Sequence, residues 1–252
     1  MRSEDIKYVI IQAGGKGIRM GRYAENKPKC LVPVKGIPMI MNTIEKYKDK
    51  EIIIIADYKA DVLEAYLSNF CKHNFNVCQT TEQGTAGGLA KVMDSIPDDE
   101  PFILTWADLF FEETPEFEFN KDLLVGLSDT FKCRWKLENN KFVNEASTEV
   151  GVAGFFAFKN KERFNKLSIS KSLVRGFLSE NYKDNEIESF TLSNCFEVGE
   201  VDKYESILVN ELNHRFFNEV IIDGDKVTKR CIDPKYEDVH SKEKLWYSAV
   251  SD

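Results

Sequence analysis

The sequence predicts a Rossmann-like α/β protein with three layers (α/β/α) and a mixed central sheet. The near-continuous apolar runs at 8–11 and 51–56 are typical of parallel strands that are covered on both faces. Strands alternate with helical stretches up to Asp108, which favours a doubly wound layer. After Asp108 short strand-like segments follow with no Pro-, Ser- or Gly-rich linker, which indicates a mixed-sheet half packed beside the first.

The expected elements follow in chain order. Segments in which apolar and polar residues alternate, or in which apolar residues are continuous, predict strands at 8–11, 51–56, 75–79, 102–106, 123–128, 133–137 and 154–158. Apolar residues spaced three and four apart predict helices at 38–47, 60–70, 86–96, 161–167 and 204–212. An Asp-Gly turn predicts a hairpin over 219–228. We expect one main domain over residues 1–213 and a carboxyl-terminal hairpin and tail over 214–252, packed on the domain or at a dimer interface.

Composition excludes several classes of protein. The chain has 252 residues and a net charge of −8, which argues against a nucleic-acid surface, because binding to phosphates needs clustered cations. No apolar run approaches the roughly 20 residues of a membrane helix, and the start is too polar for a secretory signal. We therefore expect a cytoplasmic protein that binds no nucleic acid or membrane and is a monomer or homodimer.

The six cysteines include no CxxC pair and are expected to be free thiols. Cys71, His73 and Cys78 lie close together, but no second ligand pair follows them at a zinc-finger spacing. We expect no structural zinc.

The loop after the first strand carries the main functional signal. It reads Gln12-Ala13-Gly14-Gly15-Lys16-Gly17-Ile18-Arg19. Glycines let backbone N–H groups surround an oxyanion, and nearby cations at 16, 19, 22, 27 and 29 favour a polyanion. The segment contains neither a Gly-Lys-Ser/Thr string nor the third glycine of a dinucleotide fingerprint, where Met20 stands. A plain glycine turn with solvated lysines remains the alternative on this segment alone.

A series of motifs, in the same order along the chain, resembles the nucleotidyltransferases that activate sugars and alcohols, the sugar-1-phosphate and phosphocholine pyrophosphorylases. Ala13 to Arg19 is similar to their Ala-Gly-Gly-x-Gly-x-Arg opening, and Pro28 to Pro33 to their Pro-Lys-x-Leu-x-Pro stretch. Residues 84–90 with Gln79 resemble the base-binding turn, and residues 106–110 the Gly-Asp metal strand, with Ala107 in place of Gly. Residues 196–204 resemble the Asp-x-Gly-Thr-x-x-x-Tyr element. The resemblance spans about residues 7 to 212 and implies a nucleotidyltransferase fold similar to that of the GT-A glycosyltransferases.

The resemblance also implies roles for single residues. Arg19 and Lys29 would act on the phosphates as the catalytic cations. Mg²⁺ would be held by Asp108 and by Glu197, which stands where the family has Asp and leaves Asp202 as a fallback. The nucleotide would contact Gln12, Ala13, Gly14, Gly15, Gly17, Gln79, Gly84 and Thr85. The reaction implied is attack by an acceptor phosphate on the α-phosphorus of a nucleoside triphosphate, with release of pyrophosphate.

The acceptor is less defined. Gly154 matches the family's acceptor glycine and Arg175 would meet a carboxylate or phosphate, while Phe177 stands where sugar-specific members have an acidic residue. In its size, its Gln-Ala-Gly-Gly opening and Glu197, the chain resembles the cytidylyltransferase branch of the family. It is similar in particular to the enzymes of bacterial capsule phosphoramidate synthesis that join CTP and phospho-L-glutamine into CDP-L-glutamine. CTP and UTP are not separated by these motifs. A sugar-1-phosphate uridylyl-, guanylyl- or thymidylyltransferase and a non-catalytic nucleotide-binding regulator remain alternatives. A glycosyltransferase is disfavoured, because no Asp-x-Asp motif ends the fourth strand.

Overall fold

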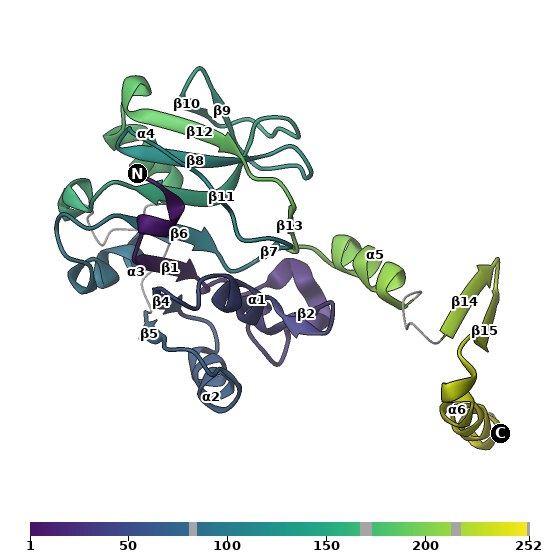
Figure 1. Ribbon diagram of the computed structural model, residues 1–252. Coiled ribbons are helices and arrows are strands. Elements are labelled where there is room, and N and C mark those ends of the chain that lie inside the picture. The colour runs from purple at the N-terminus through teal and green to yellow at the C-terminus, as the bar shows by residue number, and fades with distance from the viewer. Residues whose placement is uncertain (81–84, 167–172, 213–217, 251–252) are drawn as a thin grey trace. The chain divides into compact units, whose positions relative to one another are not determined.

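The computed structural model describes residues 1–80, 85–166, 173–212 and 218–250 (Figure 1). They form two compact units, Met1–Val201 and Asp202–Asp252. Within the described ranges no helix combines the length and apolar character needed to cross a membrane.

The first unit is built around a mixed sheet, as predicted. Its strands lie in the order β10-β9-β11-β6-β1-β4-β5, and β8 joins β11 to β12. The parallel half consists of β1 (Tyr8–Gln12), β4 (Glu51–Ala56), β5 (Asn76–Gln79) and β6 (Phe102–Trp106). The other half consists of β8 (Leu123–Ser128), β9 (Lys136–Glu138), β10 (Lys141–Val143), β11 (Gly151–Phe158) and β12 (Ile187–Thr191).

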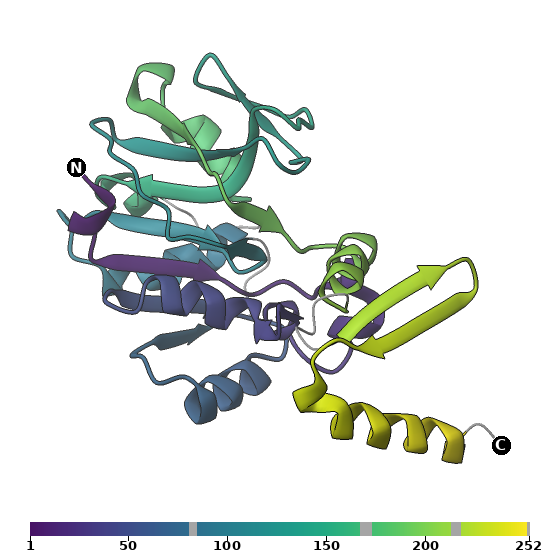
Figure 2. The same cartoon turned by 45° about the vertical axis from the view of Figure 1, so that its right-hand side comes forward.

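Helices cover both faces of this sheet, so its central strands carry apolar residues on both sides (Figure 2). On one face α1 (Met39–Lys46) and α2 (Ala60–Phe70) pack against alternate strand residues such as Ile11 and Ile54. On the other face α3 (Thr85–Val92) and α4 (Val174–Asn181) pack against residues such as Ile10 and Leu104. The predicted three-layer architecture is confirmed.

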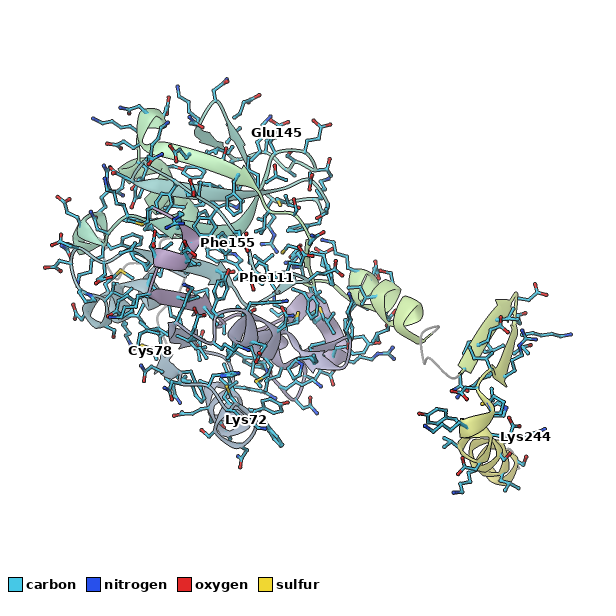
Figure 3. All side chains as sticks on the ribbon, viewed as in Figure 1. Lys72, Cys78, Phe111, Glu145, Phe155 and Lys244 are labelled. Carbon is cyan, nitrogen blue, oxygen red and sulfur yellow. The ribbon has the colours of Figure 1, made fainter. Side chains whose placement is uncertain are left out.

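The antiparallel half begins where β11 pairs with β6. All eight residues of β11 are buried, and its register opposes Phe155 to Thr105. Phe155 and Phe111 meet edge to face in the core, with ring centroids 6.1 Å apart (Figure 3). Phe111 belongs to β7 (Leu109–Phe111), which pairs with β13 (Cys195–Glu197) in a separate two-stranded sheet. This small sheet contains the predicted site residue Glu197, and its strand β7 directly follows Asp108.

Helix α4 was not predicted. Its buried residues Val174, Phe177 and Leu178 follow helical spacing, and the Phe177 ring packs against the Phe164 ring, tilted by 44° with centroids 4.8 Å apart. Phe177 is therefore a core residue, and its position does not show which acceptor binds.

Short elements complete the first unit. The 3₁₀ helices that concern the site are η2 (Ile18–Ala24) and η3 (Lys29–Leu31), followed by a hairpin of β2 (Pro33–Val34) and β3 (Ile37–Pro38). Four more 3₁₀ helices are described: η1 (Ser3–Asp5), η4 (Met93–Ser95), η5 (Glu162–Lys166) and η6 (Asp184–Glu186).

The second unit holds most of α5 (Val201–Leu212), a hairpin and a helix. The hairpin strands are β14 (Asn218–Asp223) and β15 (Lys226–Cys231), joined at Gly224, whose φ of +56° suits glycine at the predicted turn. After η7 (Pro234–Tyr236) the chain forms α6 (Glu237–Val250), which was not predicted.

An ion-pair network ties the helices at one end of the antiparallel half together. Arg163 donates to both carboxylate oxygens of Glu186, at 2.9 and 3.0 Å, and to Asp122 at 3.0 Å. These hydrogen bonds hold the pKa of Glu186 below its usual 4.5.

We expect Glu186→Gln to lower the free energy of unfolding by about 1 kcal/mol at pH 7. Because the pKa of Glu186 is lowered by folding, its contribution is complete above about pH 4.5 and is lost as the pH falls through the lowered value. Urea unfolding of both proteins at pH 7 and at pH 3 measures this. The same stability difference at both pH values would contradict it.

Candidate active site

A cavity of about 280 Å³ opens at the carboxyl ends of the parallel strands. This is the edge where open α/β sheets bind ligands, because the loops that follow neighbouring strands meet there. Its lining comprises Gln12, Ala13, Gly14, Gly15, Lys29, Cys30, Asp57, Thr80, Thr85, Trp106, Ala107, Asp108 and Leu173. Seven of these lining residues were predicted from the sequence to bind the nucleotide, to act in catalysis or to bind the metal.

The glycine loop leaves β1 and lies against two neighbouring segments. The Ala13 N–H still donates to the Ile55 carbonyl at 2.8 Å, so the loop begins in register with β4. Gly17 has a φ of +65°, and a Cβ placed there would lie 3.0 Å from the Lys29 Cβ. Gly15 has no atom within 4 Å of such a Cβ, which leaves its backbone accessible. Gly17 thus lets the loop approach η3 closely, and residues 12–15 of the loop line the cavity.

Lys29 and Asp108 form an ion pair inside the cavity. Pro28, with φ −62°, caps η3 and sets the start of the turn that carries Lys29, while Asp108 is the second residue after β6. Lys29 Nζ donates to Asp108 Oδ2, and the two side chains are only 17% and 11% exposed. A cation and a carboxylate held together away from bulk water interact more strongly than a surface pair and create a site for charged ligands.

Arg19 and Glu197 meet beside this pair. Glu197 lies opposite Leu109 in the β13–β7 pair, and the Val198 N–H donates to the Asp108 carbonyl at 2.9 Å. The carboxylates of residues 108 and 197 therefore belong to adjacent backbone segments. Arg19 Nη2 lies 3.7 Å from Glu197 Oε1.

Glu200 is a second partner of Arg19, since its Oε1 accepts a hydrogen bond from Arg19 Nη1. Sequence reasoning did not single it out, although it occupies the Thr position of the Asp-x-Gly-Thr element. Both side chains are more than 40% exposed, so this pair is weak and easily exchanged for another anion.

Three other predicted residues that the structure describes lie outside the cavity lining. Gln79 does not line the cavity, and its Nε2 donates to Glu64 Oε2 of α2 at 3.0 Å. Arg175 is also outside the lining and donates to Asn144 Oδ1. Gly154, with φ +89°, is buried against the Trp106 indole, 2.9 Å from where its Cβ would be. Gly84 lies outside the described residues.

Thr85, by contrast, lines the cavity at the start of α3. Its Oγ1 accepts a hydrogen bond from the Val174 N–H at 3.0 Å, which joins the first turns of α3 and α4. Leu173, the residue before α4, lines the cavity as well. The tie between the two helices fixes this wall.

The structure adds Asp57, Thr80 and Cys30 to the site. Asp57 follows the buried strand β4 as Asp108 follows β6, and this shared position was a signal in the sequence that could have found it. Burial raises the pKa of the Cys30 thiol to about 12, so this cysteine is protonated at neutral pH. It lines the cavity as a neutral, weakly polar group and not as a nucleophile.

The fold and this site define a Rossmann-like three-layer domain with a ligand cavity at the carboxyl ends of its parallel strands. In the solved structure of HddC from Yersinia pseudotuberculosis complexed with GMP-PN the same fold recurs with a TM-score of 0.66, covering 81% of this chain and 99% of that one at 17% identity. The family model described as the MobA-like NTP transferase domain matches residues 9–115, which is less than half of the chain. The matched segment contains the glycine loop, Lys29, Asp57 and Asp108.

Two curated relatives share sequence with the chain. One is the bifunctional protein GlmU of Methanocaldococcus jannaschii, 34% identical over 116 residues, or 44% of this chain and 27% of that protein. Another is the glucose-1-phosphate cytidylyltransferase of Salmonella typhimurium, 27% identical over 153 residues, or 48% of this chain and 60% of that protein. The chain thus matches less than two thirds of the length of either relative.

Proposed function

We propose that the protein transfers a nucleotidyl group from a nucleoside triphosphate to a phosphorylated small metabolite and releases pyrophosphate. The observation that carries the proposal is the Lys29–Asp108 pair at the end of a cavity that begins with a glycine loop. Open backbone amides, a partly buried cation and two adjacent carboxylate segments are what a reaction between two phosphates requires.

The proposed reaction is a single in-line displacement. An oxygen of the acceptor phosphate forms a bond to the α-phosphorus, and the bond from that phosphorus to the bridging oxygen of the β-phosphate breaks, so that pyrophosphate leaves with the electron pair. The nucleophile is already an anion and needs no general base. The protonated thiol of Cys30 is consistent with this scheme, since no covalent intermediate on the cysteine is required.

Lys29 and Arg19 would each change partner when substrates bind. Lys29 passes from the Asp108 carboxylate to the α-phosphate, and Arg19 passes from Glu197 and Glu200 to the β- and γ-phosphates. Both cations are held near their place of action by those carboxylates, so little reorganisation is needed. The loop backbone at Gly14 and Gly15 would donate to the triphosphate.

Asp108 and Glu197 fit a magnesium ion. Magnesium is commonly held by one or two carboxylates, with water and substrate phosphates as the other ligands. In the part of the chain that the structure describes, no group of three or more His, Cys, Asp or Glu residues is arranged to hold a metal. When bound, Mg²⁺ would supply positive charge to the phosphates at the point of transfer.

For the substrates we favour CTP and phospho-L-glutamine, giving CDP-L-glutamine, on the sequence resemblance to that cytidylyltransferase branch. One relative is named a glucose-1-phosphate cytidylyltransferase, which also supports cytidylyl transfer. Hexose 1-phosphates remain acceptor candidates, because Phe177 is buried in the core and does not bear on the acceptor.

Pyrophosphate release measured for each of CTP, UTP, ATP and GTP tests the proposal. Each triphosphate is offered with Mg²⁺ and phospho-L-glutamine, choline phosphate or glucose 1-phosphate. Release that depends on both substrates is expected with at least one pair. Saturable nucleotide binding without release from any pair would favour the regulator alternative instead.

A further inference from the structure

The cavity is charged differently at its two ends. Lys29 and Asp108 lie beyond β6, whereas Asp57 lies beyond β4. In the sheet β1 separates these strands, with Ile10 opposite both Leu104 and Ile53. Neighbouring strands are spaced about 4.8 Å apart, so the two ends are about 10 Å apart. A triphosphate is repelled by a lone carboxylate and attracted by Lys29, which assigns the Asp57 end to the nucleoside.

Asp57 is held in place by its backbone. Its carbonyl accepts a hydrogen bond from the Ala60 N–H at 3.2 Å, at the entry to α2. Its Cβ lies 3.2 Å from where a Cβ on Gly14 would be, so the residue packs against the glycine loop. Among the residues that the structure describes, no donor bonds its carboxylate. An ionised carboxylate accepts hydrogen bonds and donates none.

Gln12 adds a second acceptor to the same end. It lines the cavity, and its Oε1 is buried with no hydrogen-bond partner in the described ranges. Its Nε2 lies 3.8 Å from where a Cβ on Gly14 would be, so Gln12 and Asp57 flank the same glycine. A buried acceptor without a partner is costly and indicates a ligand that donates.

We propose that Asp57, assisted by Gln12, selects a nucleobase that carries an exocyclic amino group and rejects uracil and thymine. This inference rests on the proposed function, since it assumes that the cavity takes a nucleoside triphosphate. An amino group donates to the carboxylate, whereas the O4 carbonyl of uracil would face another acceptor and leave both groups unpaired. Gln12 adds an acceptor in the orientation observed, but its amide also has donors, so the discrimination falls mainly to the Asp57 carboxylate, which has none.

The test uses CTP and UTP, which differ at position 4 in an amino group against a carbonyl. Their dissociation constants are measured by calorimetry on the full chain without an acceptor. We expect CTP to bind about 100-fold more tightly than UTP, below the limit for a fully enclosed site because Asp57 is exposed on one side. In Asp57→Asn the side chain can donate as well as accept, and the ratio should fall below about tenfold.

Asp61→Asn is the matched control, because Asp61 lies in the first turn of α2, four residues from Asp57, and outside the cavity lining. It should keep the wild-type ratio. A wild-type preference for UTP, equal binding of the two, or an unchanged ratio in Asp57→Asn would overturn the inference. Binding without turnover would instead count against the proposed function alone, so the two failures are distinguishable.

Discussion

Lys29→Met is expected to reduce kcat for pyrophosphate release by about 10²- to 10³-fold, the effect of removing one charge-stabilising donor from an active site. Methionine keeps most of the volume of the lysine stem and removes the charge. The loss should appear in kcat more than in KM for the nucleotide, because the Lys29 charge matters most when the attacking phosphate approaches the α-phosphate. Steady-state kinetics with saturating acceptor and Mg²⁺ measure it.

Lys35→Met is the control for this variant. Lys35 is six residues further along the chain and forms an ion pair with Glu112 at 2.6 Å, but the pair is exposed and outside the cavity lining. We expect Lys35→Met to keep the wild-type kcat, and the two lysine variants to have similar melting temperatures. A Lys29→Met enzyme within about threefold of the wild type would remove Lys29 from the mechanism.

Asp108→Asn is expected to reduce kcat by about 10³-fold and to raise the Mg²⁺ concentration needed for half-maximal activity. Asparagine has the same shape but cannot provide the anionic oxygen that a hard divalent cation prefers. The fold should persist, because the bond that joins β13 to this segment uses the Asp108 carbonyl and not the side chain. A Mg²⁺ titration of kcat, with the melting temperature as a check on folding, measures both effects.

Glu112→Gln is the matched control, since it removes the carboxylate of the exposed Lys35–Glu112 pair just beyond β7. Its Mg²⁺ dependence should equal that of the wild type. If Asp108→Asn kept the wild-type Mg²⁺ dependence, Asp108 would be no metal ligand, whatever its effect on kcat. Comparing Asp108→Asn with Glu112→Gln distinguishes the loss of a metal ligand at position 108 from a general effect of removing one negative charge.

The parallel half of the sheet was predictable because its signals are local. Runs such as Ile52 to Ile55 place apolar side chains on both faces of a strand, so they indicate a buried parallel strand whatever the rest of the chain does. The signal of the glycine loop is equally local, since the loop backbone has a positive φ of +65° at position 17, which glycine adopts readily. Helix α4 was missed because only eight residues form it and three of them are buried.

The nucleoside end of the cavity could not be assigned in the same way. Gln79 was expected there from the resemblance, yet its amide bonds to Glu64 on α2, and the next residue, Thr80, lines the cavity. Successive residues at the end of a strand point to opposite faces, so a difference of one position exchanges a cavity residue for an outer one.

The sequence by itself determined the layered fold, the glycine loop, and which cations and carboxylates to consider. Those features are encoded in short stretches, by periodicity and by glycine at positions that need it. Only the tertiary structure decided that Lys29 meets Asp108 across 79 residues of chain, that Arg19 lies between Glu197 and Glu200, and that Asp57 flanks the loop. The reason is physical: strand order and register set which loop ends meet, and these arise from packing of the whole sheet.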